Sequence, residues 1–314
     1  MTGATYAQER VTAAARAQAK RRRSRRRFVI RLIKRLVILA MVVVALGPTY
    51  LVVIASINKG GSFFSATLVP HQVTFHNYRL LFTPASKGGS DFVVWVKNSV
   101  IVCFAVATLA TVCSGLMGYA FSRLRFRGRR YGLMALLMIQ IFPTVLAIPA
   151  YYYLLLWIQN HLTIGGHVVF GLGTYQGLVL VLAGGALAFN SWLFKGYLDN
   201  LPRELEEAAF VDGATRLRMI RHVVLPLAKP ITAVIFLFTF IGVYSEYAVT
   251  SIVMNSSSHY TLPVGLRGFI FNEFSQNWTI FAAGAVVASM PILVVFLALQ
   301  RYLVSGLARG AVRG

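Results

Sequence analysis

The chain has 314 residues, of which 57% are hydrophobic and only 13% are charged. A soluble domain carries about 25% charged residues, so the composition excludes a soluble globular protein and predicts an integral membrane protein. The formal net charge of +22 would suit a nucleic-acid-binding protein, but the charges cluster between long apolar runs, which argues against that class.

The first 35 residues form a basic segment that holds twelve of the 31 Lys and Arg residues, six of them arginines within residues 21–27. We expect a frayed helix or a disordered tail. Its charge is typical of a signal that keeps the start of the first membrane span in the cytoplasm. Binding to nucleic acid or to anionic lipid is the alternative interpretation.

Long uncharged runs after this tail predict membrane-spanning helices, because about 20 apolar residues cross a bilayer as an α-helix. The run from residue 131 to 194 has no Lys, Arg, Asp or Glu and is too long for one span, so we divide it at the polar stretch 159–174. The prediction is an all-α membrane protein with a transmembrane domain at 36–303 and six spans, at residues 36–57, 98–122, 131–158, 174–194, 231–254 and 274–300.

The distribution of positive charge predicts the orientation of these spans. Six spans place both termini on one side, together with the connections 123–130 and 195–230. That side holds 26 of the 31 Lys and Arg residues, and the other side holds five. Positively charged loops stay in the cytoplasm, so we expect both termini to be cytoplasmic, including the C-terminal tail at 304–314.

The connection 195–230 is the longest polar segment in the second half of the chain. Pro202 can open a helix, and the glutamates of the first turn suit the positive end of that helix. Leu205, Ala208 and Ala209 recur at helical spacing, so we expect them to share one face that another backbone can approach closely.

A second short helix should follow after a glycine turn. Gly213 can take the left-handed conformation that ends the first helix. Thr215 can cap a helix from Arg216 to about residue 222. We expect Pro226 and Pro230 to end this helix and to turn the chain.

Motifs within this connection resemble the "EAA" loop of permease subunits of type I ABC importers. They are Glu207-Ala-Ala, Asp212-Gly-Ala and Leu225-Pro-Leu. The resemblance implies a cytoplasmic loop that enters a cleft on an ATPase subunit. A helix-turn-helix DNA reader is the alternative, which the flanking membrane spans and the three first-turn glutamates disfavour.

The resemblance extends over residues 30–314 and is closest to the smaller membrane subunit of maltose/maltodextrin importers. It is carried by Ala120-Phe-Ser-Arg-Leu-Arg-Phe-Arg-Gly, Tyr260-Thr-Leu-Pro-Val-Gly-Leu and the last 15 residues. It implies a subunit of the cell (inner, cytoplasmic) membrane that moves carbohydrate. The implied partners are a second permease subunit, two ATPase subunits that use ATP and Mg, and an external sugar-binding protein. Membrane lipid surrounds such a chain, and no nucleic acid is implied.

The resemblance also implies roles for individual residues. The residues of ATPase coupling would be Glu207, Ala208, Ala209, Asp212, Gly213, Leu225 and Pro226. A C-terminal tail with Gly310, Arg313 and Gly314 would contact the ATPases. An external loop would contact the binding protein through Asn255, Ser256, Ser257, Ser258, His259 and Tyr260. An ordinary surface loop and a frayed terminus are the alternatives.

Glu246 is an acidic residue inside the predicted fifth span. On a continuous helix from Pro230 it would lie about 24 Å along the span. A carboxylate there costs a few kcal/mol unless it meets water or a partner. It would line the sugar path, face the partner subunit, or extend to the outer surface. Phe142-Pro143, residues 151–153 and Met290-Pro291 could kink spans or line the path. We favour the alternative that the aromatic residues lie at the membrane interface, where tyrosines are common.

The sequence contains no GxxxxGK[ST] loop, and its six histidines have no metal-ligand spacing. We therefore expect no catalytic residue, no metal and no bound cofactor, with ATP hydrolysed by partner subunits. The predicted function is translocation of maltose or maltodextrin. A permease for another oligosaccharide is the first alternative, and a self-sufficient secondary transporter is the second. That class needs buried ionisable residues, and Glu246 is the only candidate.

Overall fold

The computed structural model describes residues 3–59, 72–271 and 277–310. The chain divides into two compact units, residues 1–54 and 55–314. The first unit is formed by α1 (Gly3–Ser56), of which Phe28–Ser56 is long and apolar enough to cross a membrane. The basic tail is helical from Gly3 rather than disordered, in keeping with the high helix propensity of its Ala, Arg and Gln residues.

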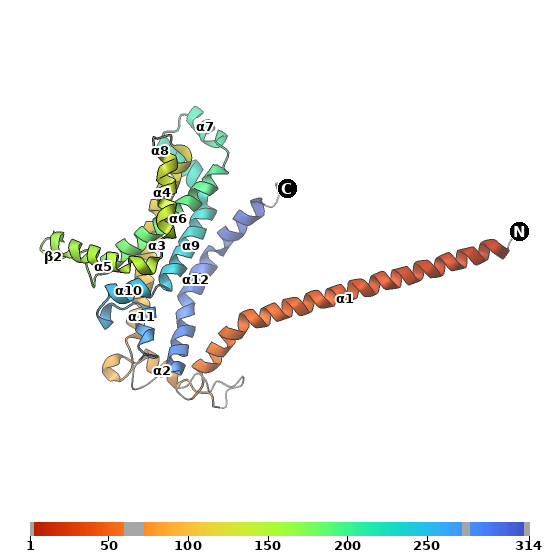
Figure 1. Ribbon diagram of the computed structural model, residues 1–314, viewed down its shortest axis with the longest axis horizontal. Helices are drawn as coiled ribbons and strands as arrows, with labels where there is room; N and C mark the ends of the chain where they lie inside the picture. Colours follow the sequence, from red (N-terminus) through yellow and green to blue (C-terminus); the bar gives the residue numbers. More distant parts are fainter. Residues whose placement is uncertain (1–2, 60–71, 272–276, 311–314) are drawn as a thin grey trace. The chain divides into compact units, whose positions relative to one another are not determined.

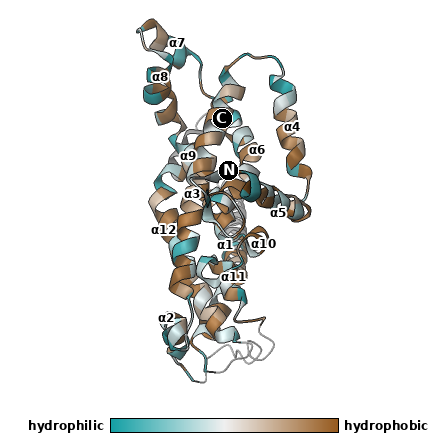
Figure 2. Cartoon of the chain, turned by 90° about the vertical axis from the view of Figure 1, so that its left-hand side faces the viewer, coloured by the Kyte–Doolittle hydropathy of each residue, from teal (hydrophilic) through white to brown (hydrophobic). Residues whose placement is uncertain are grey.

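The second unit is a bundle of long helices with short helices at both ends (Figure 1). The long ones are α3 (Phe92–Arg123), α6 (Tyr175–Asp199), α9 (Leu225–Tyr244) and α12 (Trp278–Gly310). α3 packs most extensively against α6 and then against α9, and α12 packs against α9. Brown, hydrophobic residues dominate these helices in Figure 2, as expected for segments that cross lipid.

Small residues allow α3 and α6 to approach closely. Ser114, Gly118 and Ser122 lie four residues apart on one face of α3 and are buried. A Cβ atom on Gly118 would lie 2.4 Å from the Cβ atom of Phe194 on α6. This is the small-residue packing that membrane helices use, because lipid supplies no hydrophobic force between helices.

The predicted third span is broken into two helices. α4 (Arg129–Ile141) and α5 (Thr144–His161) are bent by 102° at Phe142 and Pro143. Pro143 has no N–H and its ring would collide with a carbonyl of the preceding turn, and a residue before proline avoids the helical conformation. Phe142 is accordingly extended, with ψ 125°. The part of the chain that the structure describes thus contains five candidate spans, or six if this bent pair is one.

α5 runs out to the side of the bundle and leads to a small hairpin of β1 (Thr163–Ile164) and β2 (His167–Val168) (Figure 1). The hairpin turns through two glycines with positive φ, as a two-residue turn requires. It lies within the polar stretch at which we divided the uncharged run.

Two prolines that were expected to end a helix lie inside one instead, and this prediction was wrong. α8 (Arg216–Met219) continues through a π-helical turn, η3 (Ile220–Val224), into α9, so that residues 216–244 form one span. A π turn has wider hydrogen-bond spacing than an α-helix. It therefore accommodates Pro226 near the start of α9, and Pro230 lies one turn further on.

The remaining short helices lie after the basic tail and around the second half of the bundle. They are α2 (His76–Phe82), η2 (Ala85–Lys87), α7 (Glu204–Val211), α10 (Ala248–Val253), η4 (Ser257–His259) and α11 (Leu262–Arg267). Figure 1 shows α7 and α8 at one end of the bundle and α2 at the other.

Candidate functional site

The helix α7 forms where the sequence predicts it, with Glu204, Glu206 and Glu207 in its first turn. It ends at Val211, and Gly213 two residues later has a φ of +80°, which is the left-handed conformation. The Ala214 N–H then donates to the Ala209 carbonyl at 2.9 Å, which is the closing bond of a Schellman cap. Thr215 accepts a hydrogen bond from the Arg218 N–H and caps α8 as predicted.

A buried ion pair attaches α7 to the end of α3. Arg123 Nε lies 2.6 Å from Glu206 Oε1, and the two side chains are only 6% and 13% exposed. Arg123 also donates through Nη2 to the Leu201 carbonyl at 3.1 Å. Ser122 donates to Asp199 Oδ1 at 2.6 Å. We call these four side chains, Ser122, Arg123, Asp199 and Glu206, the α3–α7 clasp.

An apolar cluster lies beneath the same loop. Met219 of α8 is 1% exposed and belongs to a buried cluster with Phe194 and Leu198 of α6 and Ile235 of α9. Ala209 of α7 packs against the edge of this cluster. Loss of a buried Met side chain costs about 2–5 kcal/mol, so the cluster and the clasp together fix the loop on the bundle.

Four large apolar side chains of the loop are exposed. Val211 is 88% exposed and Leu217 is 76% exposed, and Leu205 and Phe210 are also exposed. Leu205, Ala208 and Ala209 have the predicted helical spacing on α7; Leu205 and Ala208 are exposed, whereas Ala209 packs against the edge of the cluster. A group of exposed apolar side chains of this kind is typical of a protein-binding surface.

Five of the seven predicted coupling residues lie together on α7 and its cap, from Glu207 to Gly213. Leu225 and Pro226 do not, because they begin α9 and line a separate groove between α9 and α12. Of the predicted C-terminal residues, Gly310 ends α12, whereas Arg313 and Gly314 lie outside the described residues.

The predicted external loop is held in place through its backbone. Trp95 Nε1 donates to the Ser257 carbonyl, and Asn98 Nδ2 donates to the carbonyls of Ser258 and Tyr260, each at 3.0 Å. His259 also packs edge-on against Tyr175. These bonds fix a 3-10 turn and leave the side chains of Asn255, Ser257 and Ser258 exposed.

Glu246 does not lie on a continuous helix. α9 ends at Tyr244, and the Glu246 carboxylate caps α10 instead. It accepts hydrogen bonds from the Val249 N–H at 2.7 Å, the Thr250 N–H at 2.9 Å and the Thr250 hydroxyl at 2.7 Å. The first turn of a helix has unpaired donors and a positive end, which explains how this carboxylate is accommodated. Because α9 is unbroken from Pro230 to Tyr244, the depth of about 24 Å along the span stays a prediction.

Glu246 also lines a cavity of about 1000 Å³ between α4, α5, α6 and the start of α10. Most of its wall is apolar, and the polar members are Gln140, Thr144, Tyr151 and Glu246. Gln140 donates to the Gly185 carbonyl at 2.8 Å. A large apolar cavity with a few converging polar groups is typical of a ligand-binding site.

The α7 loop and the 255–260 loop contact opposite ends of α3. Arg123 holds the former and Trp95 the latter, 28 residues apart on one helix. At 1.5 Å per residue that separation is about 42 Å, which matches a bilayer of about 40–45 Å with its headgroups. A helix of this length is long enough to cross a bilayer together with its headgroups.

Three residues of these sites were missed by sequence reasoning: Arg123, Gln140 and Asn98. Arg123 was counted only as a topological charge. Its position as the first charge after an uncharged run, within the Ala120–Gly128 motif, was the available signal. Nothing in the sequence connects it with Glu206, 83 residues later.

Residues 110–309 match the family described as "Binding-protein-dependent transport system inner membrane component". The chain belongs to this family. Membership in a family of transport-system membrane components confirms the resemblance found in the motifs, and it identifies the chain as a permease subunit rather than an enzyme.

Similar proteins match the permease over 70–92% of its length. The galactooligosaccharides transport system permease protein GanQ of Bacillus subtilis is 33% identical over 92% of this chain and 98% of its own. The maltose/maltodextrin transport system permease protein MalG of Escherichia coli K12 is 35% identical over 90% of this chain and 95% of its own. The maltodextrin transport system permease protein MdxG of B. subtilis is 39% identical over 70% of the permease.

Solved structures confirm the fold. A chain of a bacterial ABC transporter involved in the import of the acidic polysaccharide alginate superimposes with a TM-score of 0.69. It shares 22% identity, and the match covers 87% of the permease and 96% of that chain. The permease is therefore an all-α multi-pass membrane subunit with the fold of ABC importers.

Proposed function

We propose that the permease carries maltodextrin or a similar neutral oligosaccharide across the cytoplasmic membrane, driven by ATP that partner subunits hydrolyse. The family supports the class of transport, and the relatives MalG, MdxG and GanQ support the substrate class. The observation that carries the coupling part is the open apolar face of α7 and α8, fixed to the bundle by a buried ion pair.

In this proposal α7 enters the cleft of an ATPase subunit on the cytoplasmic side. Closure of an ATPase dimer on ATP moves α7, and the α3–α7 clasp and the Met219 cluster carry the movement to α3, α6 and α9. The bundle then exchanges inward-facing and outward-facing states, whose populations are set by ATP and by the loaded binding protein.

At the opposite surface the 255–260 turn meets the external sugar-binding protein. Its exposed Asn and Ser side chains offer the hydrogen-bond donors and acceptors that a sugar hydroxyl or a sugar cleft requires. Because the turn is fixed before binding, little conformational entropy is lost when it docks.

The sugar path follows the cavity that Gln140, Tyr151 and Glu246 line. Glu246 directs its carboxylate to α10, so its role here is to hold the end of α10 against the cavity wall. Tyr151 supplies an aromatic ring beside the polar groups. The second permease subunit, which the family architecture requires, would close the open side of this cavity.

Uptake of labelled oligosaccharides by the reconstituted complex tests the proposal. The complex contains the permease, its second permease subunit, two ATPases and the binding protein. The assay offers short linear glucans of different lengths, and we expect their uptake to depend on ATP. Uptake of galactooligosaccharides in preference to glucans would support the first alternative. Uptake of glucan without ATPase subunits, driven by an ion gradient, would contradict the proposal.

A further inference from the structure

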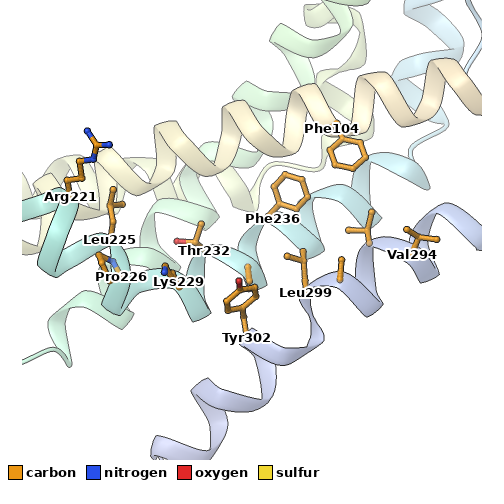
Figure 3. A pocket seen from close by; sticks show the side chains of 13 residues that line it. Phe104, Arg221, Leu225, Pro226, Lys229, Thr232, Phe236, Val294, Leu299 and Tyr302 are labelled. Atoms are coloured by element: carbon orange, nitrogen blue, oxygen red, sulfur yellow. The ribbon is translucent and has the colours of Figure 1, made fainter.

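The groove between α9 and α12 does not take part in the sites described above, and it combines an apolar interior with a cationic end. It has a volume of about 800 Å³ and is lined by stripes of residues from both helices (Figure 3). On the α9 side Arg221, Leu225, Lys229 and Phe236 follow at helical spacing. On the α12 side Val294, Ala298 and Tyr302 do the same.

The charges are gathered at one end of the groove. Figure 3 shows Arg221 and Lys229 at this end and Phe104 and Phe236 toward the other. Arg301 adds a third cation beside it, since its guanidinium donates to the Tyr302 hydroxyl at 2.9 Å. The residues that line the groove include no Asp or Glu.

The side chains of Arg221 and Lys229 form no ion pair or side-chain hydrogen bond within the described part of the chain, where the ion pairs are Arg123–Glu206 and Lys195–Asp199. A cation at the edge of a membrane is costly unless it meets water, an anion or a headgroup. The apolar interior begins within one turn of Lys229. A ligand with an anionic group and a long apolar chain would therefore fit both the cationic end and the apolar interior.

The length of the groove matches one membrane leaflet. From Arg221 to Phe236 there are 15 residues of helix, which is about 22 Å. One leaflet with its headgroups is about 20–22 Å thick, half of the full bilayer. We propose that the groove binds an anionic phospholipid of the cytoplasmic leaflet, with its phosphate at Arg221 and Lys229 and its acyl chains along Phe236 and Val294.

A transmembrane helix fits the groove less well. Cytoplasmic helix ends carry an excess of Lys and Arg, so a helix that lies along the groove would place further positive charge beside Arg221, Lys229 and Arg301. A lipid phosphate neutralises them instead. Juxtamembrane Lys and Arg residues each contribute about 1 kcal/mol to binding of anionic lipid.

The test is retention of lipid by the complete transport complex, measured by native mass spectrometry. The purified complex is delipidated and then incubated with mixed micelles of phosphatidylglycerol and phosphatidylcholine. We expect the wild type to retain phosphatidylglycerol in preference. Arg221→Gln with Lys229→Gln should weaken this retention about thirtyfold. The two lost cations contribute about 2 kcal/mol together, and each 1.4 kcal/mol corresponds to about a tenfold change in affinity.

Two further variants separate the groove from general charge effects. Arg125→Gln with Arg127→Gln removes the same charge from an exposed connection and should leave retention unchanged. Ala298→Trp fills the groove without changing its charge and should reduce retention by itself, which keeps the test decisive if the charge variant fails to assemble.

Three results would overturn the proposal. They are equal retention of phosphatidylglycerol by the wild type and the charge variant, equal retention of phosphatidylcholine and phosphatidylglycerol by the wild type, and efficient cross-linking of an Ala298→Cys variant to the second permease subunit. The last would show that a helix of that subunit fills the groove. None of them bears on sugar transport, so the lipid site and the transport function are tested separately.

Discussion

In the proposed mechanism, a movement of α7 reaches the transmembrane bundle through the contact between Arg123 and Glu206. Their side chains are almost completely buried, and removal of one partner from such a pair costs about 3–5 kcal/mol, because the other charge stays buried and unpaired. The guanidinium additionally holds the Leu201 carbonyl. Lysine, which has no planar fork, would not reproduce this geometry.

We expect Glu206→Gln and Arg123→Gln each to reduce uptake strongly and to weaken binding of the ATPase. Arg125→Gln, at an exposed position two residues away, is the matched control and should behave like the wild type. The exchange variant Arg123→Glu with Glu206→Arg should recover part of the ATPase binding. The measurements are ATPase co-purification and uptake, and wild-type coupling in Glu206→Gln would refute the role of the clasp.

Position 213 favours glycine because of its backbone conformation, not because a larger side chain would lack space. Its φ is +80°, and no atom lies within 4 Å of a Cβ placed there. Gly213→Val therefore adds only backbone strain, about 1–2 kcal/mol, and should misplace α7 without unfolding the bundle. Gly213→Ala should do less harm. Gly196→Val, at an exposed glycine of α6 without positive φ, is the control. Normal ATPase co-purification with Gly213→Val would contradict this role.

At the scale of elements, the external turn depends on two side chains of α3. Asn98 donates to the carbonyls of both Ser258 and Tyr260, and the Tyr175 hydroxyl adds a longer bond of 3.5 Å to the Ser258 carbonyl. We expect Asn98→Ala to release the turn and to lower the stimulation of ATP hydrolysis by the loaded binding protein several-fold, while ATPase co-purification stays normal. Asn160→Ala, at an exposed asparagine in the last turn of α5, serves as the control. Unchanged stimulation in Asn98→Ala would show that anchoring of the turn is unimportant.

The sequence predicts α7 and the N-terminal cap of α8 well, because the residues that determine them are neighbours in the chain. Glutamates, Gly213 and Thr215 define α7 and the cap of α8 within about a dozen residues, and the structure has them in those roles. The clasp was not predictable in this way, because it joins residues 83 positions apart. The same limit applies to the Asn98 contacts with the 255–260 turn.

Proline shows why the ends of helices were harder to predict. Pro143 breaks the predicted third span with a bend of 102°, whereas Pro226 and Pro230 remain inside a helical segment. The difference lies in the π turn before Pro226, which widens the hydrogen-bond spacing there. Such a turn depends on packing of Val224 and Met219 in the buried cluster, which the local sequence does not reveal.

At the scale of the whole molecule, α3 contacts the α7 loop at one end and the 255–260 turn at the other. We predict that tags inserted at residues 126 and 210, and at the termini 1 and 314, are cytoplasmic, and that tags at 75, 165 and 257 are external. The positive charges favour this orientation, and the separation of about 42 Å between Trp95 and Arg123 agrees with it. Protection of tags from an external protease measures it, and a cytoplasmic tag at 257 would contradict the topology.

The central claim is that the exposed face of α7 docks on an ATPase subunit, and site-specific cross-linking tests it most directly. Val211, 88% exposed, is replaced by cysteine after the native Cys103 and Cys113 have been changed to alanine. Val73→Cys, an exposed valine outside the loop, is the matched control. We predict that Val211→Cys cross-links to the ATPase in the assembled complex and that Val73→Cys does not. Failure of Val211→Cys to cross-link in a complex that transports sugar would contradict the account.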